Sequence, residues 1–308
     1  MRVSHERMGG ALRALGLSKT YGKVPVLNSL DFDIPAGCVF GLIGPNGAGK
    51  TTTIKIMMNI LQPTSGSVEM FGVDSRRLGP GDLTQIGYVS ENQEMPGWMT
   101  VKYLMNYLKP FYPGWDDARA AELVRHFELP LDRELKNFSR GMWMKAALAS
   151  ALAYRPRLLV LDEPFTGLDP LVREDLVNSL AASAGETTIF VSSHDLGELE
   201  TFATHVGYLH AGRLSFSEEM ASLSGRFRQI EVTLATAPGA SAEAGWPGEW
   251  VRREASGNVV RFVESKFEQE RTSNEIRRVF GEAPQVSIQQ MPLRAIFLTL
   301  ARHSGKAA

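Results

Sequence analysis

Short apolar runs recur along the first two thirds of the chain, and segments with a helical pattern separate them. Four of these largely apolar runs have the length of a strand that is buried on both faces: Val39–Ile43, Gly87–Val89, Leu158–Leu161 and Thr188–Val191. The spacing of apolar positions predicts helices over Thr51–Leu61 and Asp116–Phe127. Buried strands that alternate with helices predict an α/β domain with a largely parallel sheet.

The pattern changes after about Ala221. Alternating apolar residues from Ile230 to Leu234 predict a half-exposed strand, and the Ala, Gly and Pro residues of 235–248 predict a loop. The remaining expected elements are a hairpin of Trp250–Arg253 and Val259–Glu264, a helix opened by a Ser265/Glu268 capping box and closed by Gly281, a strand at Val286–Gln289, and a final helix carrying Leu293, Ile296, Phe297 and Leu300. This tail is typical of a small α+β domain.

Three segments follow from these patterns. Residues 1–15 are expected to be a loose N-terminal extension, 16–220 the α/β domain, and 226–308 the small α+β domain. The tail's arginines are mixed with acidic residues, which favours a solvated surface over a nucleic-acid site. The sequence leaves the tail's role open.

Composition and charge exclude several classes of protein. The chain has 308 residues with 44% hydrophobic and 22% charged, which excludes a disordered or low-complexity protein. Its 33 Lys and Arg residues nearly balance its 34 Asp and Glu residues, so we expect no nucleic-acid partner. Cys38, the single cysteine, follows the core pattern and favours a reducing compartment. No apolar run approaches the roughly 20 residues that cross a bilayer, so we expect no membrane span.

A glycine-rich loop carries the first chemical signal. Gly44–Thr51 fits the pattern G-x-x-x-x-G-K-[ST], follows an apolar strand and opens a helix, as a phosphate-binding loop requires. Glycines let backbone N–H groups converge on phosphate oxygens, Lys50 is expected to reach the β- and γ-phosphates, and the Thr51 hydroxyl to ligate Mg²⁺. The expected nucleotide contacts are Asn46, Gly47, Ala48, Gly49, Lys50, Thr51 and Thr52.

A pair of acids carries the second signal. The apolar strand Leu158–Leu161 runs directly into Asp162 and Glu163, at the end where parallel sheets bind ligands. Asp162 is expected to hold Mg²⁺, directly or through water. Glu163 is expected to polarise an attacking water as general base.

Together with these two motifs, further segments resemble ATP-binding cassette (ABC) ATPases. They are similar to the aspartate loop, the signature, the switch-histidine segment and the aromatic loop of that family: Pro164–Pro170, Phe138–Met142, Val191–Asp195 and Ser18–Gly22. The order of the motifs over about 200 residues is that of the family. The resemblance implies a cassette with a parallel-sheet core, an antiparallel β subdomain and a helical subdomain at about 95–155, followed here by the α+β tail.

The resemblance also implies roles for single residues. Tyr21 would stack on adenine, and His194 would contact the γ-phosphate and the attacking water. Ser139 and Gly141 would touch the nucleotide held by a second cassette, and Asp169 would lie at that interface. The implied cofactors are ATP and Mg²⁺, and the catalytic residues are Glu163, His194 and Lys50.

The resemblance further implies partners and a location. Two copies of the chain, or this chain and a homologous cassette, would bind two MgATP between them head to tail. A separate transmembrane permease subunit would carry the exported substrate, and the cassette would lie in the cytoplasm on the inner face of the cytoplasmic membrane. The tail and the Phe-Ser-Arg-Gly-Met form of the signature are most similar to the bacterial export-type subfamily.

Three positions depart from the family pattern. Glu91 stands where the family has a glutamine that couples Mg²⁺ to the membrane partner. Its carboxylate could ligate Mg²⁺ at the nucleotide site but would repel phosphate, and either Glu91 or Gln93 could fill the coupling role. Arg140 and Met142 replace a glycine and a glutamine of the signature. Arg140 could contact phosphate across the dimer or point to solvent, and the sequence favours neither.

Two alternatives stay open at this point. The Met- and aromatic-rich segment Met95–Trp115 is either core of the helical subdomain or a groove that receives a helix of the membrane partner. The alternative function is a soluble, non-transport cassette ATPase or an ATP-dependent regulator. A single cassette without heptads, and the presence of Glu163 and His194, argue against both.

Overall fold

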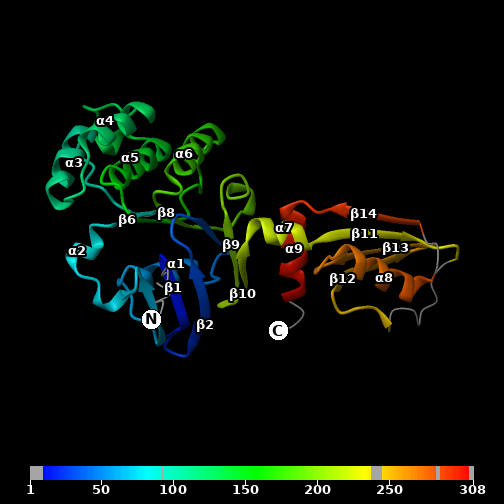
Figure 1. The fold of residues 1–308 in the computed structure, drawn as a ribbon. Coiled ribbons are helices and arrows are strands. Elements are labelled where there is room, and N and C mark those ends of the chain that lie inside the picture. The colour runs from blue at the N-terminus through cyan, green and yellow to red at the C-terminus, as the bar shows by residue number, and fades with distance from the viewer. Residues whose placement is uncertain (1–9, 92, 237–244, 282–284, 305–308) are drawn as a thin grey trace, which may run out of the picture. The chain divides into compact units, whose positions relative to one another are not determined.

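The computed structural model describes residues 10–91, 93–236, 245–281 and 285–304. The chain divides into two compact units, Met1–Ser217 and Glu218–Ala308. The first unit contains the predicted α/β domain, and the second contains the tail (Figure 1).

A six-stranded sheet forms the centre of the first unit, in the order β10-β9-β3-β8-β7-β6. Its strands are β3 (Val39–Ile43), β6 (Ile86–Ser90), β7 (Leu158–Asp162), β8 (Thr188–Ser193), β9 (His205–His210) and β10 (Arg213–Glu219). The pairs from β9 through β6 are parallel, and every residue of β3, β7 and β8 is buried. These are the continuous apolar runs of the sequence, and the predicted α/β fold with a largely parallel sheet is confirmed.

An antiparallel sheet of order β2-β1-β4-β5 lies beside this centre. Its strands are β1 (Leu12–Tyr21), β2 (Val24–Ile34), β4 (Ser65–Met70) and β5 (Val73–Asp74). The expected extension over residues 1–15 is therefore wrong for 12–15, because Leu12 pairs with both Ile34 and Met70. The buried side chains of Leu12 and Ala14 fix this register, while residues 1–9 lie outside the described part of the chain.

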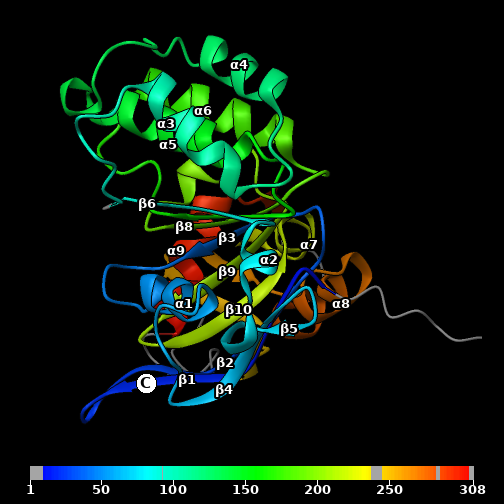
Figure 2. The ribbon, with the colours of Figure 1, turned by 90° about the vertical axis from the view of Figure 1, so that its left-hand side faces the viewer.

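The core of the first unit joins the two sheets around α1 (Lys50–Met57). The ring of Phe40 on β3 stacks on Phe32 of β2 at 6.1 Å and on Phe190 of β8 at 5.6 Å. Figure 2 shows α1 between the six-stranded sheet and the β1–β2–β4 sheet. The helix is shorter than predicted, because Asn59 adopts a positive φ and the N–H groups of Ile60 and Leu61 both donate to the Lys55 carbonyl.

Helices gather on the other side of the six-stranded sheet (Figure 2). They are α3 (Val101–Leu108), α4 (Asp117–His126) and α5 (Arg140–Leu152), with α6 (Pro170–Ser183) packed nearby. Short helical turns connect the elements of this unit: η1 (Ser75–Arg77), α2 (Pro80–Leu83), η2 (Lys109–Phe111), η3 (Leu135–Asn137) and η4 (Leu196–Glu198). The helices α3 to α5 fall within the expected helical segment at about 95–155.

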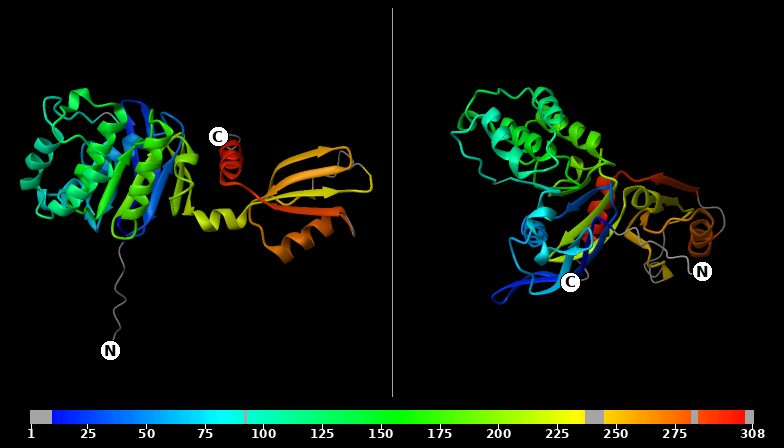
Figure 3. Two further views of the ribbon diagram at one scale, coloured as in Figure 1. Left: turned by 90° about the horizontal axis from the view of Figure 1, so that it is seen from above. Right: turned by 60° about the vertical axis from the view of Figure 1, so that its left-hand side comes forward.

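The second unit is a four-stranded antiparallel sheet of order β12-β13-β11-β14 with helices. Its elements are α7 (Met220–Arg226), β11 (Arg228–Thr233), β12 (Trp250–Ser256), β13 (Val259–Glu264), α8 (Gln269–Phe280), β14 (Gln285–Gln290) and α9 (Leu293–Ser304). Figure 3 shows α8 (orange) along one face of this sheet. Trp250 is 1% exposed and stacks on Phe262 at 4.0 Å in the core between them.

The expected capping box is wrong. Helix α8 begins after Glu268, and no side chain caps its N-terminus. The Ser265 hydroxyl instead donates to the Glu249 carbonyl at 2.9 Å, since the backbone still follows the sheet at that point. The predicted end of the helix is confirmed, because Gly281 has φ 85°, a conformation that favours glycine.

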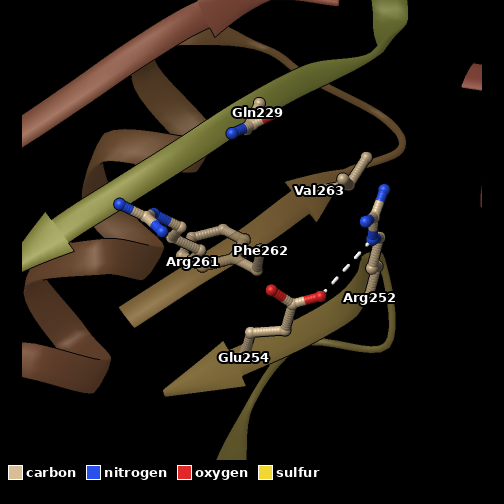
Figure 4. A pocket seen from close by; sticks show the side chains of 6 residues that line it. All are labelled: Gln229, Arg252, Glu254, Arg261, Phe262 and Val263. Carbon is tan, nitrogen blue, oxygen red and sulfur yellow. Dashed lines mark ion pairs between the residues drawn. The ribbon is translucent and has the colours of Figure 1, made fainter. Parts of the chain in front are cut away.

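The second unit carries a small hollow lined by Gln229, Arg252, Glu254, Arg261, Phe262 and Val263 (Figure 4). Its volume is about 80 Å³, well below the roughly 300–1,000 Å³ of small-molecule sites. Its charges are already paired, Arg252 with Glu254 and Arg261 with Glu231. We therefore place the functional site in the first unit. No helix in the described part of the chain is both long enough and apolar enough to span a bilayer.

Candidate functional site

The glycine-rich loop connects β3 to α1 at the carboxyl edge of the parallel sheet. Gly47 and Gly49 have φ of 80° and 111°, which disfavour other residues. A Cβ atom on Gly44 would lie 2.2 Å from the Leu209 carbonyl oxygen, so the close approach of β9 to the loop also requires glycine there. Asn46 and Gly47 are exposed, Ala48 and Gly49 are buried, and Thr52 is half-buried. The loop therefore opens outward at its tip and is held firmly at its base.

The Lys50 ammonium folds back across this loop. Its side chain is 5% exposed, and Nζ donates to the Gly44 carbonyl at 2.7 Å and the Pro45 carbonyl at 3.3 Å. The same Nζ lies 3.0 Å from Oε1 of Glu163. One cation thus lies between the loop and the second predicted motif, at the place where a bound phosphate would need it.

Asp162 is the last residue of β7 and is 5% exposed. Its Oδ1 accepts hydrogen bonds from the Thr51 hydroxyl at 3.2 Å and the Ser192 hydroxyl at 2.6 Å. A carboxylate and a hydroxyl that face one another are oxygen ligands of the kind that Mg²⁺ prefers. The residues present therefore fit the Mg²⁺ that the sequence leads us to expect at Thr51 and Asp162.

Glu163 is the centre of the arrangement. Its backbone has φ 51°, an unfavourable conformation for a residue other than glycine, and such strain is characteristic of functional sites. Its carboxylate contacts Lys50 through Oε1, and Oε2 lies 2.8 Å from His194 Nδ1 and 3.2 Å from the Thr166 hydroxyl that donates to it. Burial acts to raise the pKa of Glu163, but the His194 and Lys50 contacts together outweigh it and lower that pKa.

His194 follows β8 and has a side chain that is 43% exposed. The hydrogen bond to Glu163 is the main reason that the pKa of His194 is raised. The imidazole is therefore anchored on one side by Glu163 and open to solvent on the other. A ligand that approaches the loop can reach it.

Sequence reasoning missed the residues that orient these side chains. Ser192 is fully buried, and its hydroxyl both donates to Asp162 and accepts from the Glu163 N–H at 3.0 Å. Behind the histidine, the 6% exposed Glu198 accepts a hydrogen bond from the Ser193 hydroxyl, and burial raises the pKa of Glu198. Only the Ser-Ser pair before the histidine indicated them, because Ser192 on β8 meets Asp162 on the neighbouring strand β7.

The predicted signature opens α5. Ser139 is the N-cap of this helix, and its hydroxyl accepts the Met142 N–H at 3.3 Å. Gly141 packs against Val172, where an added Cβ atom would lie 3.0 Å from a methyl group. Asp169 similarly caps α6 by accepting the Val172 N–H at 3.0 Å. Ser139, Gly141 and Asp169 thus lie at the adjoining starts of two helices.

Two of the three departures from the family pattern, Glu91 and Arg140, meet. Nη2 of Arg140 lies 2.6 Å from Oε1 of Glu91, within one chain. The sequence left Arg140 either a phosphate contact across the dimer or solvent; in the single chain its side chain is 45% exposed and its guanidinium also pairs with this carboxylate. Gln93, the other candidate, has its side-chain oxygen 3.4 Å from the Ser90 N–H that donates to it. Tyr21, expected to stack on adenine, ends β1 and is 47% exposed.

The comparisons with known proteins agree with this arrangement. Residues 27–166 match the family described as ABC transporter. The chain is 31% identical over 217 residues to the bacitracin transport ATP-binding protein BcrA of Enterococcus faecalis, covering 69% of this chain and 70% of BcrA. It is 30% identical over 310 residues to the daunorubicin/doxorubicin resistance ATP-binding protein DrrA of Streptomyces peucetius, covering 95% and 93%.

A solved structure is similar as well. The structure of an ATP binding subunit of an ABC transporter superposes with a TM-score of 0.64 at 27% identity. It covers 70% of this chain and 92% of that one. The similarity to DrrA extends over the tail, whereas the similarity to this structure and to BcrA covers about the length of the first unit.

Proposed function

Because this chain belongs to the family of ABC transporter ATP-binding proteins, we propose that it drives export of a drug-like or antibiotic-like molecule through a separate membrane subunit. Its established part is that of an ATP-binding, ATP-hydrolysing subunit. The observation that carries the proposal is the Glu163 carboxylate, held between Lys50 and His194 beside the glycine-rich loop. In this proposal, ATP hydrolysis at this site drives the export.

Each of these side chains has a proposed role. Lys50 binds the β- and γ-phosphates by exchanging its carbonyl and carboxylate partners for phosphate oxygens. Glu163 then accepts a proton from the attacking water as general base, and its lowered pKa keeps it ionised. His194, tied to Glu163 through Nδ1, presents its other ring nitrogen to the γ-phosphate. Thr166 and Ser192 hold the carboxylates in place.

Thr51 and Asp162 would hold Mg²⁺, which supplies charge neutralisation to the phosphate oxygens when bound. Tyr21 stacks on the adenine through its exposed ring. The backbone of Asn46, Gly47, Ala48 and Gly49 and the side chain of Thr52 line the phosphates.

A second copy of the chain completes each site in this proposal. Ser139 and Gly141 contact the nucleotide on the partner cassette, with the N-terminus of α5 supplying partial positive charge. Asp169, at the start of α6, lies at the same interface. The tail belongs to the proposed exporter because the similarity to the resistance protein DrrA spans nearly the whole chain.

The membrane subunit docks, we propose, on an aromatic row on and around α3. The row consists of four side chains that are each about half exposed: Trp98, Tyr103, Tyr107 and Phe111. Their rings follow one another at 5.1, 6.5 and 5.5 Å, which makes a continuous apolar stripe. Such a stripe suits the apolar face of a partner helix. Docking there would hold the cassette on the inner face of the membrane.

The test of the catalytic proposal is Glu163→Gln. Without the general base, steady-state ATP hydrolysis should fall by at least about a hundredfold, while MgATP binding persists. Two bound nucleotides should then hold two chains together, which light scattering detects as a dimer at saturating MgATP. Hydrolysis at the wild-type rate, or a monomer under these conditions, would refute the composite catalytic site.

The test of the docking row is Tyr107→Ser combined with Phe111→Ser. Because these side chains lie away from the Glu163 site, hydrolysis by the isolated chain should be unchanged. Recovery of the chain with membranes from cells that express the whole transporter should be lost. Ile60→Ser, which changes another side chain that is 61% exposed, is the matched control and should not affect membrane recovery.

A further inference from the structure

Two of the three residues that depart from the family pattern, Glu91 and Arg140, contact each other. Glu91 replaces a glutamine after β6, and Arg140 replaces a glycine at the start of α5. Although 49 positions separate them in the sequence, Nη2 of Arg140 lies 2.6 Å from Oε1 of Glu91. Each substitution therefore supplies the charge that the other one requires.

The position of Arg140 favours an acidic partner. It is the first residue of α5, directly after the N-cap Ser139, where the helix dipole disfavours a positive charge. Its side chain is 45% exposed, so water provides part of the compensation. The Glu91 carboxylate provides the rest, at a distance typical of a charge-assisted hydrogen bond.

A second loop packs against the same guanidinium. Gly167 has φ 71°, and a Cβ atom built there would lie 3.3 Å from Cζ, the guanidinium carbon of Arg140. Gly167 belongs to the loop that begins at Glu163 and ends at Asp169. The guanidinium therefore lies between the Glu91 loop and the loop of the proposed general base.

Glu91 lies beside the nucleotide site. Its backbone N–H donates to the Asp162 carbonyl oxygen at 3.0 Å, and β6 and β7 pair in parallel up to that point. An unpaired carboxylate next to Asp162 would repel a polyanionic nucleotide. A glutamine at this position carries no such charge, and here the charge is neutralised by Arg140.

We propose that Glu91 and Arg140 act as one unit, in which Arg140 is a positioning residue that neutralises Glu91 and fixes the start of α5 against the nucleotide site. The proposal rests on the ATP-binding site described under the proposed function. It predicts that Arg140 matters for MgATP binding only while Glu91 is present. The pair thus replaces the neutral glutamine and glycine of the family pattern.

The test is a double-mutant cycle of Glu91→Gln and Arg140→Gln on the full chain. Arg140→Gln alone should weaken MgATP binding roughly tenfold, as measured by titration calorimetry, because residues in one ion pair are strongly coupled. Adding Glu91→Gln should restore binding to within about twofold of the wild type. High salt should reduce the effect of Arg140→Gln, because the pair is partly exposed.

Two controls make the result specific. Arg119→Gln with Glu122→Gln removes another partly exposed ion pair, on α4 at 3.0 Å, and should leave MgATP binding unchanged. Arg140→Gly in place of Arg140→Gln checks that rescue does not depend on a new amide contact. Thermal unfolding of each variant identifies any that fail to fold. If one does, the double-mutant cycle is repeated with the charge reversals Glu91→Arg and Arg140→Glu.

The pairing is refuted if Arg140→Gln weakens MgATP binding equally with and without Glu91→Gln, or does not weaken it at all. A wild-type chain that binds no MgATP would instead refute the proposed nucleotide site. The two failures are therefore distinguishable.

Discussion

Ser192→Ala tests how the two acidic side chains are held. The Ser192 hydroxyl is fully buried, donates to Asp162 Oδ1 at 2.6 Å and accepts the Glu163 N–H at 3.0 Å. Loss of a hydrogen bond to a charged group costs about 1.5–3 kcal/mol. The Glu163 N–H keeps a second acceptor, the Ser192 carbonyl at 3.3 Å. Loss of its bond to the Ser192 hydroxyl therefore adds little to the destabilisation. We therefore expect a destabilisation of about 2 kcal/mol.

For a unit of this size, about 2 kcal/mol lowers the unfolding temperature by roughly 4–8 °C. Differential scanning calorimetry measures this shift, and a steady-state phosphate-release assay measures the accompanying loss of hydrolysis, which we expect to be about tenfold. The loss of rate follows from Asp162 and Glu163 losing their shared anchor.

Ser183→Ala is the matched control. Ser183 is also buried, at 7% exposed, but its hydroxyl donates only to the Ser179 carbonyl one turn earlier in α6. Its removal should change the unfolding temperature little, because alanine favours the helix. If Ser192→Ala unfolds at the same temperature as Ser183→Ala and hydrolyses ATP at the wild-type rate, the reasoning fails.

Three further changes have defined outcomes. Lys50→Ala should abolish MgATP binding in titration calorimetry. An unchanged affinity for MgATP would refute the assignment of Gly44–Thr51 as a phosphate-binding loop. The pKa of His194 is raised above its ordinary 6.5 by Glu163, so protonated His194 stabilises the fold below that pH and the contribution is lost as pH rises through the folded-state pKa. The wild type should therefore exceed His194→Ala in unfolding temperature most at mildly acidic pH, below 6.5 but where Glu163 with its lowered pKa is still ionised, and a difference that is constant with pH would contradict this. Trp250→Ala, which removes the stack on Phe262, should cost about 3–5 kcal/mol and lower a calorimetric transition; an unchanged thermogram would contradict that.

Local signals account for the elements that the sequence predicted well. The strand Val39–Ile43 has the predicted bounds, because a continuous apolar run can only be buried on both faces. Where two local signals competed, prediction failed. Ser265 and Glu268 have capping-box spacing, but Ser265 is already bonded to Glu249 of the neighbouring chain segment, and the helix starts later. Such long-range partners are absent from a local pattern.

The N-terminal boundary failed for a related reason. Residues 12–15 carry no strong strand pattern of their own, yet Leu12 pairs with strands at Ile34 and Met70. Pairing on both sides of a central strand supplies the stability that the local sequence lacks. The start of the domain is thus set by its neighbours.

The sequence by itself determined the chemistry: a glycine-rich loop before Lys50, two acids at a strand end and a histidine after another strand require no tertiary information to recognise. Only the tertiary structure decided how these groups meet, with Glu163 bound by both Lys50 and His194, and Arg140 paired with Glu91. The physical reason is that backbone conformation and strand burial are encoded over a few neighbouring residues. Contacts between charged side chains depend instead on how strands and helices that are distant in sequence pack together. A local sequence pattern contains no information about that packing.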